Sequence, residues 1–111
     1  MTTVAESWKA KQTDETRMVE AHLKPHFEQV DVYRYNLASI RIRVIDRRFE
    51  KQSRVNRDSM VEPFLDELPE ETQRDIVTLF TFAPAELVLS PHTLSECLLN
   101  GEFENPTPSN L

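Results

Sequence analysis

The chain has 111 residues, 39% of them hydrophobic, which suits one compact domain and leaves too little length for two independent cores. No apolar run approaches the roughly 20 residues that a membrane-spanning helix needs, and no basic flank with an apolar core marks a signal peptide. We therefore expect a cytoplasmic protein without a membrane partner. The single cysteine, Cys97, excludes an intramolecular disulfide and cannot by itself build a zinc or cluster site.

The net charge of −6 is unevenly distributed along the chain. Between Arg34 and Arg57, eight positive side chains stand against two acids, which gives +6 for this basic band and −12 for the remainder. Such a band can bind nucleic acid phosphates, an acidic protein partner, or the chain's own carboxylates. Ion pairs within the protein and solvation explain most of the positive charge of this band, because seventeen acids lie elsewhere in a small domain. The eight cations are Arg34, Arg41, Arg43, Arg47, Arg48, Lys51, Arg54 and Arg57.

Residues 1–12 are polar, and nothing periodic holds their few apolar side chains, such as Trp8. We interpret them as a loose N-terminal arm. A first helix is predicted from Asp14, because apolar residues recur near helical spacing after it and acids suit the start of a helix. Pro25 is expected to end or kink this helix.

The hydrophobic period changes to two from Val30, which predicts two β-strands joined by a short turn at residues 36–38. Alternate apolar side chains of the second strand should face the core, so the arginines between them should lie on the opposite face of the sheet. Aromatic rings among guanidinium groups can anchor a protein or stack on single-stranded nucleic acid. A half-buried tyrosine pair beside solvated arginines is the simpler alternative. The core residues are Ile40, Ile42 and Val44, and the outer residues are Tyr33, Tyr35, Arg41 and Arg43.

A polar turn after Arg48 leads into an amphipathic helix with apolar residues at i, i+3, i+4 and i+7. Pro63 predicts that this helix starts no earlier than about Ser59, because a proline deep in a helix loses a hydrogen bond. The nearly continuous apolar run at residues 76–82 then predicts a third strand. The stripe of the helix consists of Val61, Phe64, Leu65 and Leu68.

Ser90 and Pro91 predict the start of a last helix, and Gly101 is expected to cap its C-terminus. Residues 102–111 carry two prolines and little apolar content apart from Phe103, so they predict an extended tail. The side chains expected to face inward from this helix are Leu94, Cys97 and Leu98.

The elements are therefore predicted in the order helix, strand, strand, helix, strand, helix. This order describes a single small α+β domain at residues 13–101, in which helices cover a three-stranded mixed sheet. An N-terminal arm at 1–12 precedes the domain, and a tail at 102–111 follows it.

The segment from Phe49 to Val61, FEKQSRVNRDSMV, together with this order of elements resembles the BolA family, whose topology is that of class II KH domains. In BolA-like proteins a phenylalanine and an acid close the second strand, and a serine, a valine, a basic residue and an apolar helix residue follow. Here Phe49, Glu50, Ser53, Val55, Arg57 and Val61 take those places without a gap. Lys51 replaces the family's glycine, and Asp58 replaces its histidine.

The resemblance also implies an association with monothiol glutaredoxins and a shared iron-sulfur cluster, bound by a histidine at the start of the third strand. Asp75 holds that place here, and a carboxylate is a poor substitute for imidazole at an iron-sulfur centre. His22 and His26 form an i, i+4 pair that Pro25 interrupts, and no third ligand accompanies them. We therefore expect no metal site and no cofactor.

An enzyme is not expected either, because the chain has no glycine-rich phosphate loop and no nucleophile elbow. The first hypothesis is a non-enzymatic interaction or regulatory module that binds a protein partner, or itself, through the exposed sheet face and the basic turn. The second is nucleic-acid binding through the segment 41–57. The third, least favoured, is iron-sulfur cluster trafficking with a monothiol glutaredoxin. The turn residues common to the first two hypotheses are Arg47, Arg48, Lys51, Arg54 and Arg57.

Overall fold

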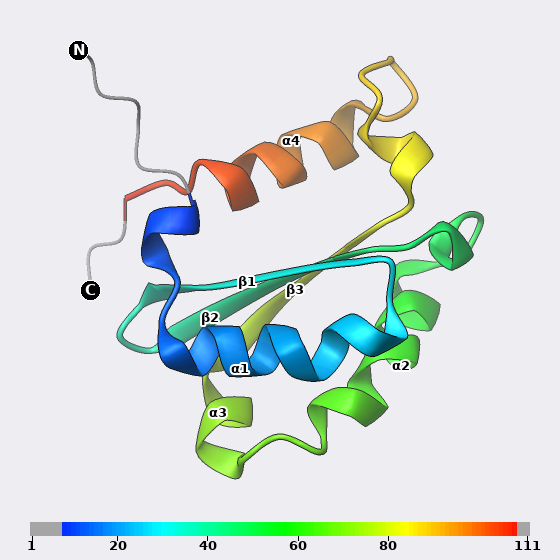
Figure 1. Ribbon diagram of the computed structural model, residues 1–111. Helices are drawn as coiled ribbons and strands as arrows, with labels where there is room; N and C mark the ends of the chain where they lie inside the picture. The colour runs from blue at the N-terminus through cyan, green and yellow to red at the C-terminus, as the bar shows by residue number, and fades with distance from the viewer. Residues whose placement is uncertain (1–7, 109–111) are drawn as a thin grey trace.

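The computed structural model describes residues 8–108 of the chain. Three layers make up this part of the protein: α1 and α2 cover one face of a three-stranded sheet, and α4 lies across the other (Figure 1). The helices are α1 (Asp14–Leu23), α2 (Arg54–Leu65), α3 (Glu70–Asp75) and α4 (Leu94–Glu104), and the strands are β1 (Gln29–Asn36), β2 (Ser39–Ile45) and β3 (Ile76–Phe82). Short 3-10 helices are η1 (Trp8–Lys11), η2 (Lys24–His26), η3 (Arg47–Phe49) and η4 (Pro84–Leu87). Within residues 8–108, none of the helices has the length and apolar character needed to cross a membrane.

The sheet has β2 in the centre, paired antiparallel with β1 and parallel with β3. A tight turn joins β1 to β2, while α2 and α3 make the crossover from β2 to the parallel strand β3. This confirms the predicted α+β class, the mixed sheet, the order of elements and the turn at residues 36–38. The first core lies between this sheet and α1 and α2, and it contains the residues predicted for it. Its fully buried members include Val19, Leu23, Val30, Val32, Ile40, Ile42, Val44, Phe49 and Val61.

A second core lies on the opposite face of the sheet, beneath α4 and η1. Its members are mostly aromatic: the ring centroids of Tyr33 and Phe103 are 4.8 Å apart, and those of Trp8 and Phe103 are 5.6 Å apart. The prediction that this sheet face is exposed is therefore wrong. Tyr33 is fully buried, and Arg43 is only 3% exposed.

Buried arginines explain why α4 covers this face. The Arg43 guanidinium donates to the Asp31 carboxylate at 2.7 Å, and its Nη1 donates to Asn100 Oδ1 at 2.7 Å and to Glu104 Oε2 at 2.9 Å. Arg41 Nη1 lies 3.0 Å from Glu102 Oε2 in a second contact of the same kind. Since a buried charge without partners costs several kcal/mol, the polar face of α4 turns toward the sheet.

The orientation of α4 corrects three predictions. Leu94 and Leu98 were expected to face inward, but they are 49% and 67% exposed. Gly101 lies inside the helix, which continues to Glu104, so it is not the C-terminal cap. Phe103, assigned to the tail, is fully buried in the second core.

Helix α2 also begins earlier than predicted. Its N-terminus is at Arg54, where the Ser53 hydroxyl accepts a hydrogen bond from the backbone N–H of Asn56 at 3.1 Å. Pro63 therefore lies inside the helix, two residues before its end at Leu65, where its missing N–H removes the hydrogen bond to the carbonyl oxygen of residue 59 in the preceding turn. Trp8 of η1, which lies in the predicted N-terminal arm, is buried in the second core; residues 1–7 of that arm lie outside the described range.

Substitution of Arg43 by alanine is predicted to lower the free energy of unfolding by about 3 to 5 kcal/mol, because it leaves the carboxylates of Asp31 and Glu104 near the sheet without their partner. Urea denaturation measures this loss. Arg47→Ala is the matched control: the Arg47 side chain is 83% exposed, so losing its ion pair should cost less than about 1 kcal/mol. Equal small losses for the two variants would contradict the buried position of Arg43.

Candidate interaction surface

The basic turn, defined as residues 47–57, joins the end of β2 to the first turn of α2 and lies close to η4, which follows β3 (Figure 1). Three buried side chains hold its backbone in place. The three are Asp46, Phe49 and Arg57.

Asp46 fixes the entrance to the turn. Its carboxylate is 2% exposed and accepts from the backbone N–H of Arg48 at 2.9 Å, from the Arg48 guanidinium at 2.8 Å and from the backbone N–H of Glu28 at 3.1 Å. These hydrogen bonds, that of the Arg48 side chain above all, lower the pKa of Asp46 from 3.8 to about 2. The ionised carboxylate therefore holds η3 against the start of β1.

This lowered pKa predicts a pH-dependent contribution to stability. The pKa of Asp46 is about 2 in the folded protein and near 3.8 in the unfolded chain, so its stabilisation is fully present above about pH 4 and is lost as the pH falls toward 2. Asp46→Asn should lower the free energy of unfolding by about 2 kcal/mol at pH 7. Urea titrations from pH 7 to pH 2 should show this difference shrinking with pH; a constant difference would contradict the account.

Lys51 adopts a left-handed conformation with φ of 65° at the tip of the turn, and no other non-glycine residue among 8–108 has a positive φ. Glycine adopts this conformation without a steric penalty, whereas a lysine pays about 1 kcal/mol. This is the position at which Lys51 replaces the glycine expected from the resemblance. The backbone conformation is thus that of a glycine turn, with a lysine side chain added to its surface.

Arg57 fastens the turn to η4. Its guanidinium donates to both oxygens of Glu86, at 2.8 and 2.6 Å, and to the carbonyl oxygens of Thr81 and Gln52, each at 3.0 Å. The bidentate contact is also the main cause that lowers the pKa of Glu86. Because Arg57 is only 6% exposed, its predicted place on a binding surface is wrong. Glu86 was not predicted to take part, although it lies three residues after Ala83 and accepts from its N–H in the pattern of a helix N-terminus.

Internal ion pairs neutralise most of the basic band. Six of its eight cations lie within 4 Å of a carboxylate oxygen, and only Lys51 and Arg54 make no ion pair with another of the residues 8–108. Both are exposed, as is the neighbouring Val55, whose side chain is 73% exposed. The paired cations and their acids are Arg34 with Glu15 and Asp75, Arg41 with Glu102, Arg43 with Asp31 and Glu104, Arg47 with Glu28, Arg48 with Asp46, and Arg57 with Glu86.

The predicted site residues therefore divide into two separate groups. Those of the sheet face lie beneath α4, where the Arg41 guanidinium stacks on the Tyr35 ring at 3.8 Å and Tyr35 donates to the carbonyl oxygen of Thr107. Those of the turn lie beyond the end of β2, and four of them are exposed. In the covered group, Tyr33 and Arg43 are buried and Tyr35 and Arg41 are partly buried, and the exposed group is Arg47, Arg48, Lys51 and Arg54.

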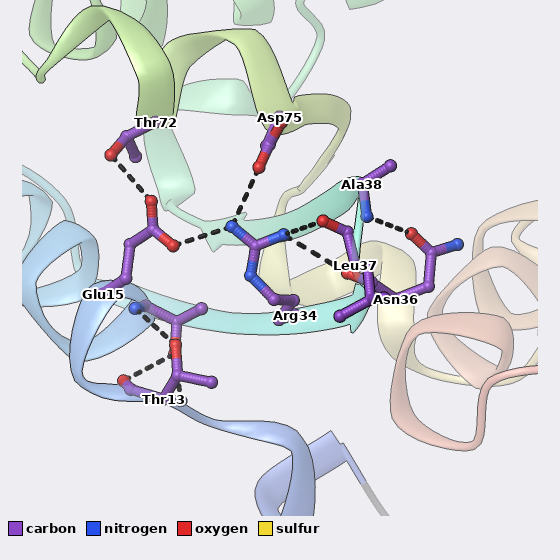
Figure 2. Close-up of polar contacts among 9 residues, drawn as sticks. Thr13, Glu15, Arg34, Asn36, Leu37, Ala38, Thr72 and Asp75 are labelled. Atoms are coloured by element: carbon purple, nitrogen blue, oxygen red, sulfur yellow. Dashed lines mark hydrogen bonds and ion pairs between the residues drawn. The ribbon is translucent and has the colours of Figure 1, made fainter. Parts of the chain in front are cut away.

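Asp75, at the position where the resemblance expects a ligand histidine, is part of a polar network around Arg34 (Figure 2). Arg34 Nη2 lies 3.0 Å from Asp75 Oδ2 and 2.7 Å from Glu15 Oε1, and the other oxygen of Glu15 accepts from the Thr72 hydroxyl at 2.8 Å. The Arg34 contact lowers the pKa of Glu15. Arg34 also donates to the carbonyl oxygen of Leu37, so the network joins α1, α3 and the β1–β2 turn.

The histidines do not converge on a shared site. His22 Nε2 lies 2.9 Å from a carboxylate oxygen of Glu67, whereas the His26 ring stacks on Phe64 with 4.0 Å between centroids. Within residues 8–108, no three side chains of histidine, cysteine, aspartate or glutamate are grouped so that they could hold a metal ion.

Comparisons with known proteins agree with this architecture. No family model and no curated protein matches the sequence. Among solved structures, the chain is similar to the solution structure of BolA1 from Mus musculus, with a TM-score of 0.52 and 18% sequence identity over 78% of this chain and 76% of that chain. This likeness shows that the fold is BolA-like.

Proposed function

We propose that this BolA-like domain is a non-enzymatic interaction module that binds an acidic segment of a protein partner through its basic turn. Lys51 and Arg54 supply the charged contacts, and Val55 supplies an apolar contact beside them. The observation that carries the proposal is that these two cations, alone in the basic band, have no carboxylate oxygen within 4 Å among residues 8–108 and are both exposed. The carboxylates of Asp58 and Glu86 attract Arg54 only at longer range.

The rigidity of the turn supports this proposal. Phe49 is fully buried beneath it, and Arg57 ties it to Glu86 at two points, so its backbone is fixed before a partner arrives. A preorganised surface loses less conformational entropy on binding. Charged and apolar side chains held side by side can therefore recognise a short segment that carries both carboxylates and an apolar residue.

Nucleic-acid binding has less support. Two unpaired cations would give affinity that falls with only about the second power of salt concentration, whereas typical sites contact six to ten phosphates. The net charge of −6 also repels a polyanion. A cluster shared with a glutaredoxin has less support still, because Asp75 is occupied by its ion pair with Arg34.

The test compares partners recovered from the native host by wild type and by the double variant Lys51→Asn/Arg54→Gln. Asparagine tolerates a positive φ, so the turn should keep its conformation. The variant should bind the recovered partner about 30- to 1000-fold more weakly, because it loses two charged hydrogen bonds that are worth about 1 to 2 kcal/mol each.

Arg17→Gln/Arg74→Gln is the matched control, since it removes two exposed positive charges from α1 and α3. It should bind the partner like wild type. Equal affinity of the turn variant and wild type would reject the proposal. Titration with single-stranded and duplex oligonucleotides at about 50 mM salt should show no tight binding; a steeply salt-dependent affinity would favour the nucleic-acid alternative instead.

A further inference from the structure

Strand β3 forms one edge of the sheet, and only β2 pairs with it in the described part of the chain. The Phe82 carbonyl oxygen accepts from the N–H of Asp46, just after β2, at 3.0 Å, so it points toward the centre of the sheet. The carbonyl oxygen of the residue before it, Thr81, accepts instead from the Arg57 guanidinium at 3.0 Å. Because the backbone groups of successive strand residues point to alternate sides, the N–H and carbonyl of Leu79 point outward, like those of Thr81.

The outward side of β3 is open for a short stretch centred on Leu79. No other residue that the structure describes hydrogen-bonds to the outward N–H and carbonyl of Leu79. Val77, the extra residue of a β-bulge opposite Ile40 and Arg41, has a side chain that is 61% exposed. The bulge limits the open stretch at one end, and the Arg57 contact limits it at the other. Unpaired N–H and carbonyl groups on an edge strand are a template for a further strand.

A cavity of about 230 Å³ opens beside the first residue of β3. Leu65 and Ile76 supply apolar lining, while Glu62 and Asp66 add two carboxylates. Among the described residues, no lysine, arginine or histidine nitrogen lies within 4 Å of either carboxylate. Asp58 lies one turn before Glu62 on the same side of α2, and its Oδ1 is buried without a hydrogen-bond partner. A lysine or arginine from another chain can bury its methylene groups against the apolar lining and place its charge beside these acids.

Charge identifies the occupant of this edge as cationic. Residues 58–82, which cover most of α2 and all of α3 and β3, contain seven acids and one cation, Arg74, and therefore carry a charge of −6. Of these seven acids, only Glu67 and Asp75 form ion pairs with a cation of the described residues. The whole protein also carries −6, so it attracts a basic segment and repels a second copy of itself.

From these observations we infer that an extended, basic segment of a protein partner adds a fourth strand to the sheet at β3. Its backbone pairs with that of Leu79, and one of its lysines or arginines enters the cavity beside Glu62 and Asp66. In this mode of recognition, backbone hydrogen bonds give affinity and side-chain pockets give specificity. The surface goes beyond the proposed function, because it selects a basic segment instead of an acidic one and lies outside the basic turn.

Peptide titration followed by NMR tests the surface. The probe is a capped seven-residue peptide of alternating valine and lysine, which should bind wild type with a Kd below about 1 mM and shift the amide signals of β3. Glu62→Gln/Asp66→Asn should bind it about tenfold more weakly. Asp14→Asn/Glu50→Gln is the matched control, since it removes two exposed carboxylates elsewhere, and it should bind like wild type. Equal affinity of the two variants, or no shift in β3 of wild type, would overturn the inference.

Hydrogen exchange tests the strand pairing itself. The N–H of Leu79 points outward and that of Phe80 points toward β2, so Leu79 should exchange at least about tenfold faster in the free protein. Saturating peptide should slow the exchange of Leu79 and leave that of Phe80 nearly unchanged. Equal protection of the two amides in the free protein, or a Leu79 rate that the peptide does not alter, would contradict an added strand.

Two further peptides separate strand pairing from simple attraction of charge. The valine-lysine peptide with N-methyl groups at alternate residues keeps its charge but loses its strand hydrogen bonds, so it should bind at least about tenfold more weakly. A peptide of alternating valine and glutamate should not bind. Equal binding of the methylated peptide would reduce the effect to charge alone and reject the inference. A Leu79 signal that shifts with protein concentration in the absence of peptide would assign the edge to a second copy and equally reject it.

Discussion

The buried guanidinium of Arg43 determines how the two faces of the sheet are used. It extends from the central strand and is 3% exposed, so it must find its partners inside the protein. Asp31 on the neighbouring strand supplies one carboxylate, while Asn100 and Glu104 supply the remaining acceptors from α4. A charge this deeply buried is tolerated only when such partners are in place. The buried arginine on the central strand therefore requires α4 to cover this face of the sheet.

The position of α4 has two consequences for function. It buries Tyr33 and Arg43 and partly covers Tyr35 and Arg41, so the fully exposed cations of the basic band are those of the turn at residues 47–57. It also directs Leu94 and Leu98 outward, because the opposite side of the helix is occupied by Phe103 and the polar residues that reach the arginines. Two surfaces with different chemistry result: a small, rigid, cationic turn at the end of β2, and an uncharged apolar face on α4.

Much of the fold could be predicted because its signals are local. The two-residue period of β1 and β2, the turn between them and the apolar stripe of α2 all follow from short-range patterns, and Lys51 stands in the left-handed conformation of the glycine that the resemblance expects. The site was predicted poorly because its contacts join residues that are far apart in the sequence. Arg43 and Glu104 are 61 residues apart, and the acids that neutralise the basic band are spread over α1, β1, η4 and α4. The predictions for Leu94, Leu98 and Gly101 failed for a related reason. Their local pattern is typical of a buried helix face and a C-terminal cap, whereas the orientation of α4 depends on its contacts with the buried arginines, which are distant in the sequence.

The central claim, that α4 seals the sheet face over Arg43, is tested most directly by nuclear Overhauser effects between aromatic protons. The Phe103 ring centroid lies 4.8 Å from that of Tyr33 and 5.6 Å from that of Trp8. The account predicts cross-peaks from the Phe103 ring to both of these rings, together with helical chemical shifts through residues 94–104. Random-coil shifts in this segment, or a Phe103 ring without cross-peaks to Tyr33, would show that the sheet face is open and would contradict it.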